Sequence, residues 1–269
     1  MPELPEVETI ANGLNKRVAG DVIESVWVGS RKQPLKSRPA QIIRVLEGSR
    51  ITRVSRVGKH IVAYLENGRG PAEWVIHLGM TGKMLVAAPE NVVEKHTHLI
   101  AKLASGRELR FVDPRMFGKL QVLPGKSFSA PGAEPIHADK EHFMKLFKGR
   151  KTPIKSALLN QALLSGIGNI YADESLFRAG IRPRRRAASL TRADLLHLYD
   201  AIQEVLAEAI AAGGSSVSDY VDADGQEGFF QLVHRVYQRT GEPCLVCKTP
   251  IKRVVIGGRS SHYCPKCQK

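Results

Sequence analysis

The cysteines of the chain have the spacing of a metal site. They form two pairs near the C-terminus, Cys244-x2-Cys247 and Cys264-x2-Cys267. Each pair can hold one ion from a tight turn, and the two pairs together complete a tetrahedral thiolate shell for zinc. Because four protein ligands close that shell, the pattern predicts one structural zinc ion and not a catalytic one. Such clustering also favours metal over disulfides in a cytosolic protein.

The stretch between the cysteine pairs is basic and contains Gly257-Gly258, which predicts a hairpin turn followed by Arg259. A zinc-stapled hairpin that presents an arginine is suited to enter a groove of a nucleic acid. A ribbon that only caps the fold, with Arg259 as a solvated charge, explains the same residues equally well.

The start of the chain carries a second candidate, Pro2 followed by Glu3. Removal of Met1 exposes a secondary amine, and α-amines titrate near pH ~8, well below the value of about 10.4 for lysine. Such an amine is nucleophilic at neutral pH and forms Schiff-base intermediates, with an adjacent carboxyl group to move protons. Most Met-Pro termini are inert, so these two residues by themselves leave the choice open.

The surrounding pattern indicates which elements position these residues. Residues 5–18 place apolar side chains on one helical face after Pro5, and residues 139–212 show helical periodicity in the segments 141–149, 152–164, 171–180 and 191–212. Between them, residues 20–125 consist of short β-rich segments broken by Gly, Asn and Pro, typical of a sandwich or barrel. We expect residues 123–137 to be a linker.

The charge balance points to a polyanionic partner. There are 40 Lys and Arg against 26 Asp and Glu, for a net charge of +14. A surplus of this size is the electrostatic footprint of nucleic-acid binding, although a basic protein without such a partner is the alternative. We find no apolar run long enough for a membrane span and no secretory signal, so we expect no membrane partner and a cytoplasmic protein.

Several blocks along the chain resemble the formamidopyrimidine-DNA glycosylase family, in family order. They are MPELPEVET at the N-terminus, VGKHIVAYL (57–65), HLGMTGKM (77–84), KHTHLIAKL (95–103), DPRMFG (113–118), SGIGNIYADESLFRAGI (165–181) and the four-cysteine finger. The resemblance implies an α+β multidomain protein, with an N-terminal catalytic β-sandwich and flanking helices (1–130), a helix–two-turns–helix DNA-binding domain (131–228) and a C-terminal zinc-finger β-hairpin (229–269). DNA would bind in the cleft between them.

The same resemblance implies a bifunctional DNA glycosylase and AP lyase of base excision repair. It assigns the nucleophile to Pro2 and the proton donor to Glu3. Lys59 would act in the first elimination, and Arg259 would act in the second and hold phosphate. The implied partner is double-stranded DNA that contains oxidised purines or abasic sites, bound by a monomer in the bacterial cytosol or nucleoid. One structural Zn²⁺ and no organic cofactor are expected.

DNA contacts are also implied by the resemblance. Met80, Arg115 and Phe117 would fill the gap left by a flipped base, since apolar wedges unstack bases and an arginine can pair with the orphaned cytosine. Asn169, in the glycine-rich turn 165–169, together with His96, Lys151 and Lys155, would contact the DNA backbone. Residues 215–228 match the loop that closes over the flipped base. Thr97 and Met116 differ from the residues most common in the family at these positions. Met116 removes one possible phosphate contact.

Two other interpretations remain. An endonuclease VIII-like glycosylase for oxidised pyrimidines shares the terminal proline and the finger, but Leu4 and the trio of Met80, Arg115 and Phe117 favour the purine enzyme. A non-catalytic zinc-ribbon protein that binds nucleic acid explains the charge and the cysteines, and leaves the N-terminal block unexplained.

Overall fold

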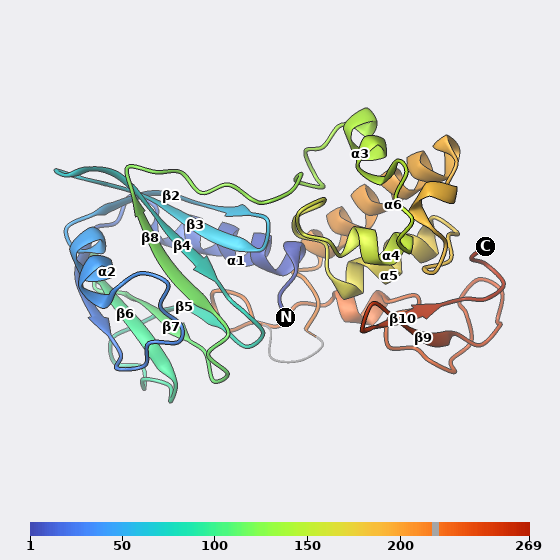
Figure 1. The fold of residues 1–269 in the computed structure, drawn as a ribbon. Coiled ribbons are helices and arrows are strands. Elements are labelled where there is room, and N and C mark those ends of the chain that lie inside the picture. Colours follow the sequence, from blue (N-terminus) through green and yellow to red (C-terminus); the bar gives the residue numbers. More distant parts are fainter. Residues whose placement is uncertain (217–220) are drawn as a thin grey trace. The chain divides into compact units, whose positions relative to one another are not determined.

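The computed structural model describes residues 1–216 and 221–269. Within this part, the chain forms two compact units (Figure 1). The first contains residues 1–129 and 212–229, and the second contains residues 130–211 and 230–269. Among the described residues, no helix has the length and apolarity that crossing a bilayer requires.

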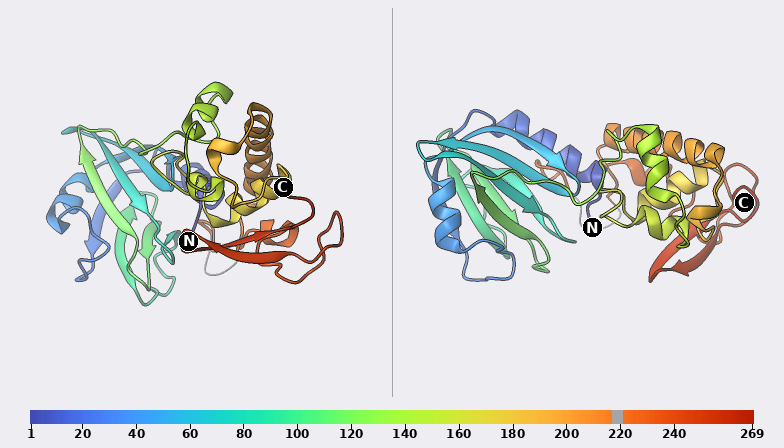
Figure 2. Two further views of the ribbon diagram at one scale, coloured as in Figure 1. Left: turned by 45° about the vertical axis from the view of Figure 1, so that its right-hand side comes forward. Right: turned by 45° about the horizontal axis from the view of Figure 1, so that its top comes forward.

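The first unit is a β-sandwich of two antiparallel sheets, counted over the described residues (Figure 2). One sheet has the order β1-β6-β7-β5 and the other β2-β3-β4-β8. The strands are β1 (Ile23–Val28), β2 (Arg50–Val57), β3 (His60–Asn67), β4 (Gly70–His77), β5 (Lys83–Ala87), β6 (Thr97–Leu103), β7 (Glu108–Val112) and β8 (Lys119–Pro124). Alternate side chains point inward from each sheet, and Trp74 and Phe111 are fully buried between them. The predicted sandwich and its strands are confirmed.

Two helices flank the sandwich. Helix α1 (Leu4–Val18) begins with Pro5 in its first turn and buries Val7, Ile10 and Leu14, as its periodicity predicts. Helix α2 (Pro39–Leu46) is not predicted by the sequence, which indicates only strands between residues 20 and 125. It is a short helix that starts with a proline and buries three apolar residues, too few to stand out from the β-rich segments around it.

The second unit combines helices with the C-terminal hairpin. Its helices are α3 (Lys140–Phe147), α4 (Ile154–Leu158), α5 (Asn169–Arg178) and α6 (Arg192–Ala211), with short 3-10 turns η1 (Ala187–Ser189) and η2 (Phe230–Val233). The segment 152–164 is helical only as far as Leu158. Beyond it, the side chain of Asn160 accepts a hydrogen bond from Ala162 N, which offers the backbone a turn in place of another helical bond.

The hairpin consists of β9 (Lys252–Ile256) and β10 (Arg259–Tyr263), paired in an antiparallel register. Gly257 and Gly258 form the connecting turn with φ values of 55° and 74°, which a two-residue hairpin turn of type I′ requires. The predicted hairpin is therefore present, and it presents Arg259 directly after the turn.

The two compact units do not follow the predicted domains 131–228 and 229–269. Residues 212–229 belong to the first unit, where Ala223 lies in the hydrophobic core and its carbonyl accepts a hydrogen bond from Val86 N. The hairpin packs with the helices, because Cys264 and Val236 share a core with Phe177 of α5.

Candidate functional site

The N-terminal turn is held by a buried carboxylate. Pro2 and Glu3 are both buried, and the nitrogen of Glu3 donates to Glu6 Oε2 at 2.8 Å. The other oxygen of Glu6 accepts from the nitrogen of Ser215, also at 2.8 Å. One side chain therefore joins the start of α1 to the backbone at Ser215. Chain ends normally fray, so this anchoring gives Pro2 a defined position.

Lys59 lies in the two-residue turn between β2 and β3, with 8 % of its surface exposed. Gly58 precedes it with a φ of 60°, which places a glycine where a hairpin turn of type II′ needs one. The guanidinium of Arg56 donates to the carbonyl of Gly58 at 3.0 Å and to Glu8 Oε2 at 2.6 Å. Arg56, which the sequence did not single out, thus ties the turn that carries Lys59 to the helix that follows Pro2.

The loops that carry the expected gap-filling residues are organised by Asp113, which is fully buried. Its carboxylate accepts hydrogen bonds from Thr81 Oγ1 at 2.5 Å and from Gly118 N at 2.7 Å. Its own nitrogen donates to the carbonyl of His96 at 3.0 Å. One aspartate therefore joins the loop after β4, the loop after β7 and the backbone before β6.

Met80, Arg115 and Phe117 emerge from these loops toward solvent. Met80 is 40 % exposed and Phe117 is 52 % exposed, unusual values for large apolar side chains beside a packed core. The guanidinium of Arg115 lies over the Phe117 ring at 5.0 Å. The structure thus brings the three predicted residues to neighbouring loops of one unit, and this arrangement suits insertion into DNA better than core packing.

Two histidines form a cross-strand pair beside the Lys59 turn. His60 of β3 pairs with His77 of β4, and their rings are 4.8 Å apart. Burial, with smaller effects from His77 and Lys36, lowers the pKa of His60 from 6.5 to about 4. Burial and the charges of Lys59 and Lys119 lower the pKa of His77. Both rings are therefore neutral at pH 7.

In the second unit, Asn169 and Arg259 line one polar cavity of about 410 Å³. Asn169 is the first residue of α5 and follows the glycine-rich turn, where helix N–H groups favour an anion. Arg253, Gln238 and Ser260 line the same cavity, and Arg253 was not singled out by sequence reasoning. Two guanidinium groups and a helix N-terminus make this cavity suited to a phosphate.

The two remaining lysines predicted to contact DNA differ in their surroundings. Lys151 is exposed, as a phosphate ligand must be. Lys155 is completely buried, and its ammonium lies 2.7 Å from Asp173 Oδ1. The resemblance implied a phosphate contact from Lys155, and this placement does not fit one, because the ammonium is buried against a carboxylate.

The cysteines converge as the spacing predicts. The sulfur atoms of Cys244, Cys247, Cys264 and Cys267 all lie within 4.8 Å of one another. A zinc ion with bonds of about 2.3 Å in tetrahedral geometry needs sulfurs ~3.8 Å apart. The separations of 3.9 Å between Cys244 and Cys267 and 3.4 Å between Cys247 and Cys264 fit such an ion.

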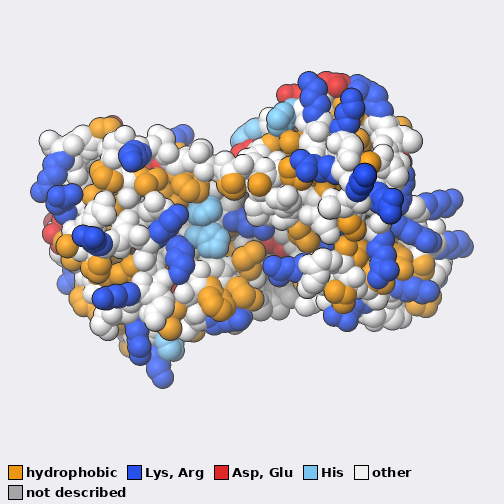
Figure 3. Space-filling model, in the orientation of Figure 1, with side chains coloured by type: hydrophobic (Ala, Val, Ile, Leu, Met, Phe, Trp, Pro, Cys, Tyr) orange, Lys and Arg blue, Asp and Glu red, His pale blue; other side chains and the backbone are white. Residues whose placement is uncertain are grey.

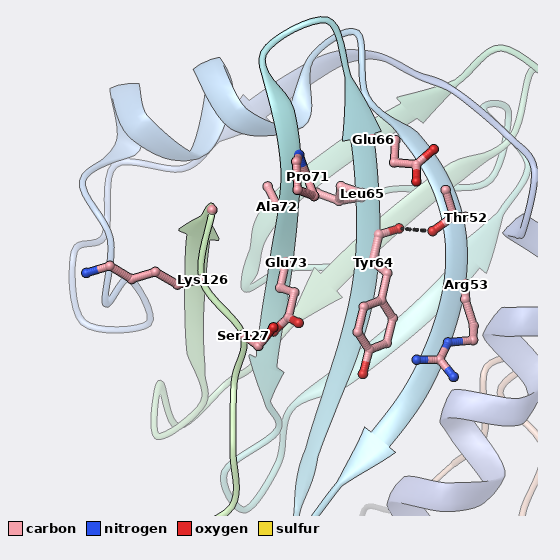
Figure 4. A pocket seen from close by; sticks show the side chains of 11 residues that line it. Thr52, Arg53, Tyr64, Leu65, Glu66, Pro71, Ala72, Glu73, Lys126 and Ser127 are labelled. Carbon is pink, nitrogen blue, oxygen red and sulfur yellow. Dashed lines mark hydrogen bonds between the residues drawn. The ribbon is translucent and has the colours of Figure 1, made fainter.

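A further cavity of about 410 Å³ lies on the outer face of the β2-β3-β4-β8 sheet (Figure 4). Arg53 covers the ring of Tyr64 at 4.3 Å, and Thr52 Oγ1 donates to the Tyr64 carbonyl. None of the described residues that line this cavity is a predicted site residue. This cavity is therefore separate from the candidate site.

Positive charge is spread over the surface of both units. On the face shown in Figure 3, Lys and Arg side chains are far more widespread than Asp and Glu. This distribution agrees with the net charge of +14 and with a polyanionic partner.

Comparison with known proteins decides the family. Residues 1–120 match the formamidopyrimidine-DNA glycosylase N-terminal domain, residues 130–221 match the formamidopyrimidine-DNA glycosylase H2TH domain, and residues 241–269 match the zinc finger found in FPG and IleRS. The formamidopyrimidine-DNA glycosylase of Solibacter usitatus is 48 % identical over 280 residues, covering 100 % of both chains. The chain belongs to the formamidopyrimidine-DNA glycosylase family.

Solved structures agree. A mutant FPG of Lactococcus lactis, in complex with DNA that contains Fapy-dG, aligns over 100 % of both chains with a TM-score of 0.90 and 33 % identity. The MutM (FPG) protein of Thermus thermophilus aligns over 99 % of this chain and 98 % of its own, with a TM-score of 0.87 and 41 % identity.

These matches confirm the family, the fold class and the zinc finger that the sequence predicted. A zinc ribbon alone accounts for residues 241–269 and leaves the first two matched domains unexplained. The roles of the individual site residues stay predictions. Part of the loop expected to close over a flipped base, residues 217–220, lies outside the described residues.

The neutral histidines predict a pH-dependent stability. Because the folded pKa of His60 is about 4 and the unfolded value is 6.5, the unfolded state binds the extra proton. The resulting stability is present above pH 6.5 and is lost as the pH falls toward 4. We expect His60→Leu to reduce the pH dependence of the urea unfolding midpoint between these pH values. The reduction is partial, because His77 and His234 also have lowered pKa values. Parallel pH curves for variant and parent would contradict this.

The contact between the two gap-filling loops predicts a strong effect of Gly79→Ala. A Cβ at Gly79 would lie 2.5 Å from Gly118 N and from the carbonyl carbon of Phe117. Its φ of 64° adds strain of about 1–2 kcal/mol. Gly106→Ala is the matched control, because it has a φ of 83° and open space around it. We expect Gly79→Ala to lose more unfolding free energy than the control and to weaken binding to lesion DNA. Equal losses would remove the packing argument.

The cysteine geometry predicts that zinc holds the hairpin in place. Cys247→Ser removes one ligand, and we expect the bound zinc to fall well below one ion per chain. DNA affinity should fall with it, because the hairpin carrying Arg259 depends on the metal for its fold. Elemental analysis and a fluorescence anisotropy titration measure the two quantities. A zinc-free protein with unchanged DNA affinity would show that the finger is not needed for binding.

Proposed function

We propose that this protein is a base excision repair enzyme that removes oxidised purines, 8-oxoguanine and formamidopyrimidines, from double-stranded DNA and then cuts the strand. The observation that carries the proposal is the match over the whole chain, with Pro2 and Glu3 in an anchored turn at the start of α1. DNA bearing Fapy-dG and DNA bearing an abasic site are bound in structures of Lactococcus lactis relatives. Its place of action is the bacterial cytosol, where the chromosome lies.

The nucleophile is the nitrogen of Pro2 after removal of Met1. In the structure this nitrogen forms the peptide bond to Met1, so the amine exists only in the processed chain. The lone pair attacks C1′ of the deoxyribose, the bond from C1′ to the base breaks, and the base leaves with the electron pair. The amine loses its proton, Glu3 supplies a proton to O4′, and the C1′–O4′ bond breaks, so that the sugar ring opens and the nitrogen and C1′ remain joined as an iminium.

The iminium makes the two strand cuts possible. Loss of a proton from C2′ breaks the C3′–O bond, and Lys59 donates a proton in this first elimination. Loss of a proton from C4′ then breaks the C5′–O bond, and Arg259 stabilises the departing phosphate. The rigid turn around Lys59 and the cavity around Arg259 support these roles, because a displaced acid or guanidinium loses most of its effect.

Access to C1′ requires the damaged nucleotide to leave the base stack. Met80 and Phe117 fill the gap as apolar wedges, and Arg115 pairs with the orphaned cytosine. Asn169, Lys151 and His96 hold the DNA backbone. His96, with a φ of 73°, is exposed beside the Asp113-centred loops, which supports a backbone contact there. The zinc ion has a structural role when bound: it holds the hairpin that presents Arg259.

The second candidate is an endonuclease VIII-like enzyme for oxidised pyrimidines. The exposed trio of Met80, Arg115 and Phe117 and the match of residues 1–120 favour the purine enzyme. A panel that compares 8-oxoguanine opposite cytosine with thymine glycol separates the two. We expect faster excision of 8-oxoguanine, and faster excision of thymine glycol would support the second candidate.

The nucleophile is tested by trapping with borohydride, which reduces the iminium to a stable amine. We expect a covalent complex between the processed protein and DNA that contains 8-oxoguanine. A protein that retains Met1 has an amide at Pro2 in place of an amine, so its trapping should fall at least a hundredfold. Circular dichroism and zinc content serve as controls for folding. Strong trapping with Met1 still attached would contradict the assignment.

A further inference from the structure

Lys155 lies at the centre of a buried polar network that joins three elements of the second unit. Its ammonium contacts Asp173 Oδ1 at 2.7 Å and donates to the carbonyl of Ser260, also at 2.7 Å. Lys155 belongs to α4, Asp173 to α5 and Ser260 to β10. Asp173 and Lys155 are both completely buried at their side chains. A buried charge pair of this kind needs such partners, because neither charge is stable there alone.

The network holds the strand that carries Arg259. Ser260 directly follows Arg259, so the bond from Lys155 fixes the peptide unit next to that arginine. Asp173 Oδ2 accepts a hydrogen bond from His262 N at 2.8 Å and lies 3.0 Å from His262 Nδ1. Both anchors lie within three residues of Arg259 along β10.

Another part of the cavity lining is held by the next residue of α5. Glu174 accepts hydrogen bonds from the nitrogens of Val236 at 2.9 Å and Tyr237 at 2.8 Å. Tyr237 lines the same cavity as Arg259 and Asn169. Two consecutive carboxylates of one helix thus hold the segments that contribute Tyr237 and His262 to the lining, and α5 itself supplies Asn169.

We propose that Lys155 and Asp173 are positioning residues for Arg259: they set the guanidinium for the second elimination and do not contact DNA themselves. This inference rests on the proposed function, since it concerns the step in which the C5′–O bond breaks. That step needs a cation at the departing phosphate oxygen, and a shift of about 1 Å in such a group costs up to ~100-fold in rate. The first elimination and the attack by Pro2 use residues of the other unit.

The test measures the two eliminations separately. Lys155→Met keeps the length of the side chain and removes its ammonium. With DNA that contains an abasic site, we expect the ratio of second to first elimination products to fall at least tenfold under single-turnover conditions. Borohydride trapping should stay within about twofold of the parent, because the amine of Pro2 is untouched.

Lys155→Met leaves Asp173 as an unpaired buried charge, which endangers folding. The double variant Lys155→Met/Asp173→Asn removes both charges, and it should show the same fall in product ratio with parental zinc content. Arg110→Met is the matched control, since it breaks a buried ion pair with Glu108 in the first unit. Its product ratio should equal that of the parent.

Three outcomes overturn the inference. The first is a parental product ratio in the double variant, and the second is an equal fall in Arg110→Met. The third is an unchanged ratio together with a weaker, less salt-dependent DNA affinity, which would make Lys155 a phosphate ligand. A parent protein that forms no trapped complex would instead refute the proposed function and is recognised before any variant is made.

Discussion

The carboxylate of Glu6 is the contact on which the proposed chemistry depends. An enzyme that uses its N-terminal amine must hold the part of a chain that is usually least ordered. Here, one oxygen of Glu6 accepts from Glu3 N and the other from Ser215 N. The burial of Leu4 and Val7 then fixes α1 against the sandwich. Because these contacts lie beyond Pro2, they leave its nitrogen available once Met1 is removed.

The same principle recurs at the other functional elements. In a chain with a net charge of +14, buried acids organise the groups that we expect to meet DNA. Asp113 joins the loops of Met80 and Phe117 through Thr81 and Gly118. Asp173 holds the strand of Arg259 through Lys155 and His262. Each carboxylate accepts several hydrogen bonds, which fix the surrounding backbone. On this account, the exposed cations provide affinity for DNA, and the buried carboxylates fix the positions of the loops and the strand that carry the site residues.

The sequence revealed the features that leave a local pattern. Short β-rich segments between Gly, Asn and Pro identified the strands, periodicity identified α1 and α6, and the paired cysteines identified the zinc site. Contacts between distant residues leave no such pattern. Arg56 joins Glu8 to the Lys59 turn across 48 residues, and Lys155 meets Asp173 from another helix. The resemblance named Lys155 as a DNA ligand, whereas the structure shows that its charge is compensated in the interior. Helix α2 was missed because eight residues give too weak a periodic signal.

The central claim is that the nitrogen of Pro2 forms the covalent bond to the sugar. The most direct test is peptide mapping by mass spectrometry of the borohydride-reduced complex between the processed protein and DNA containing 8-oxoguanine. Our account predicts that the sugar adduct lies on the N-terminal peptide and that fragmentation places it on Pro2. An adduct on a lysine, such as Lys59, with an unmodified N-terminal peptide would contradict the account.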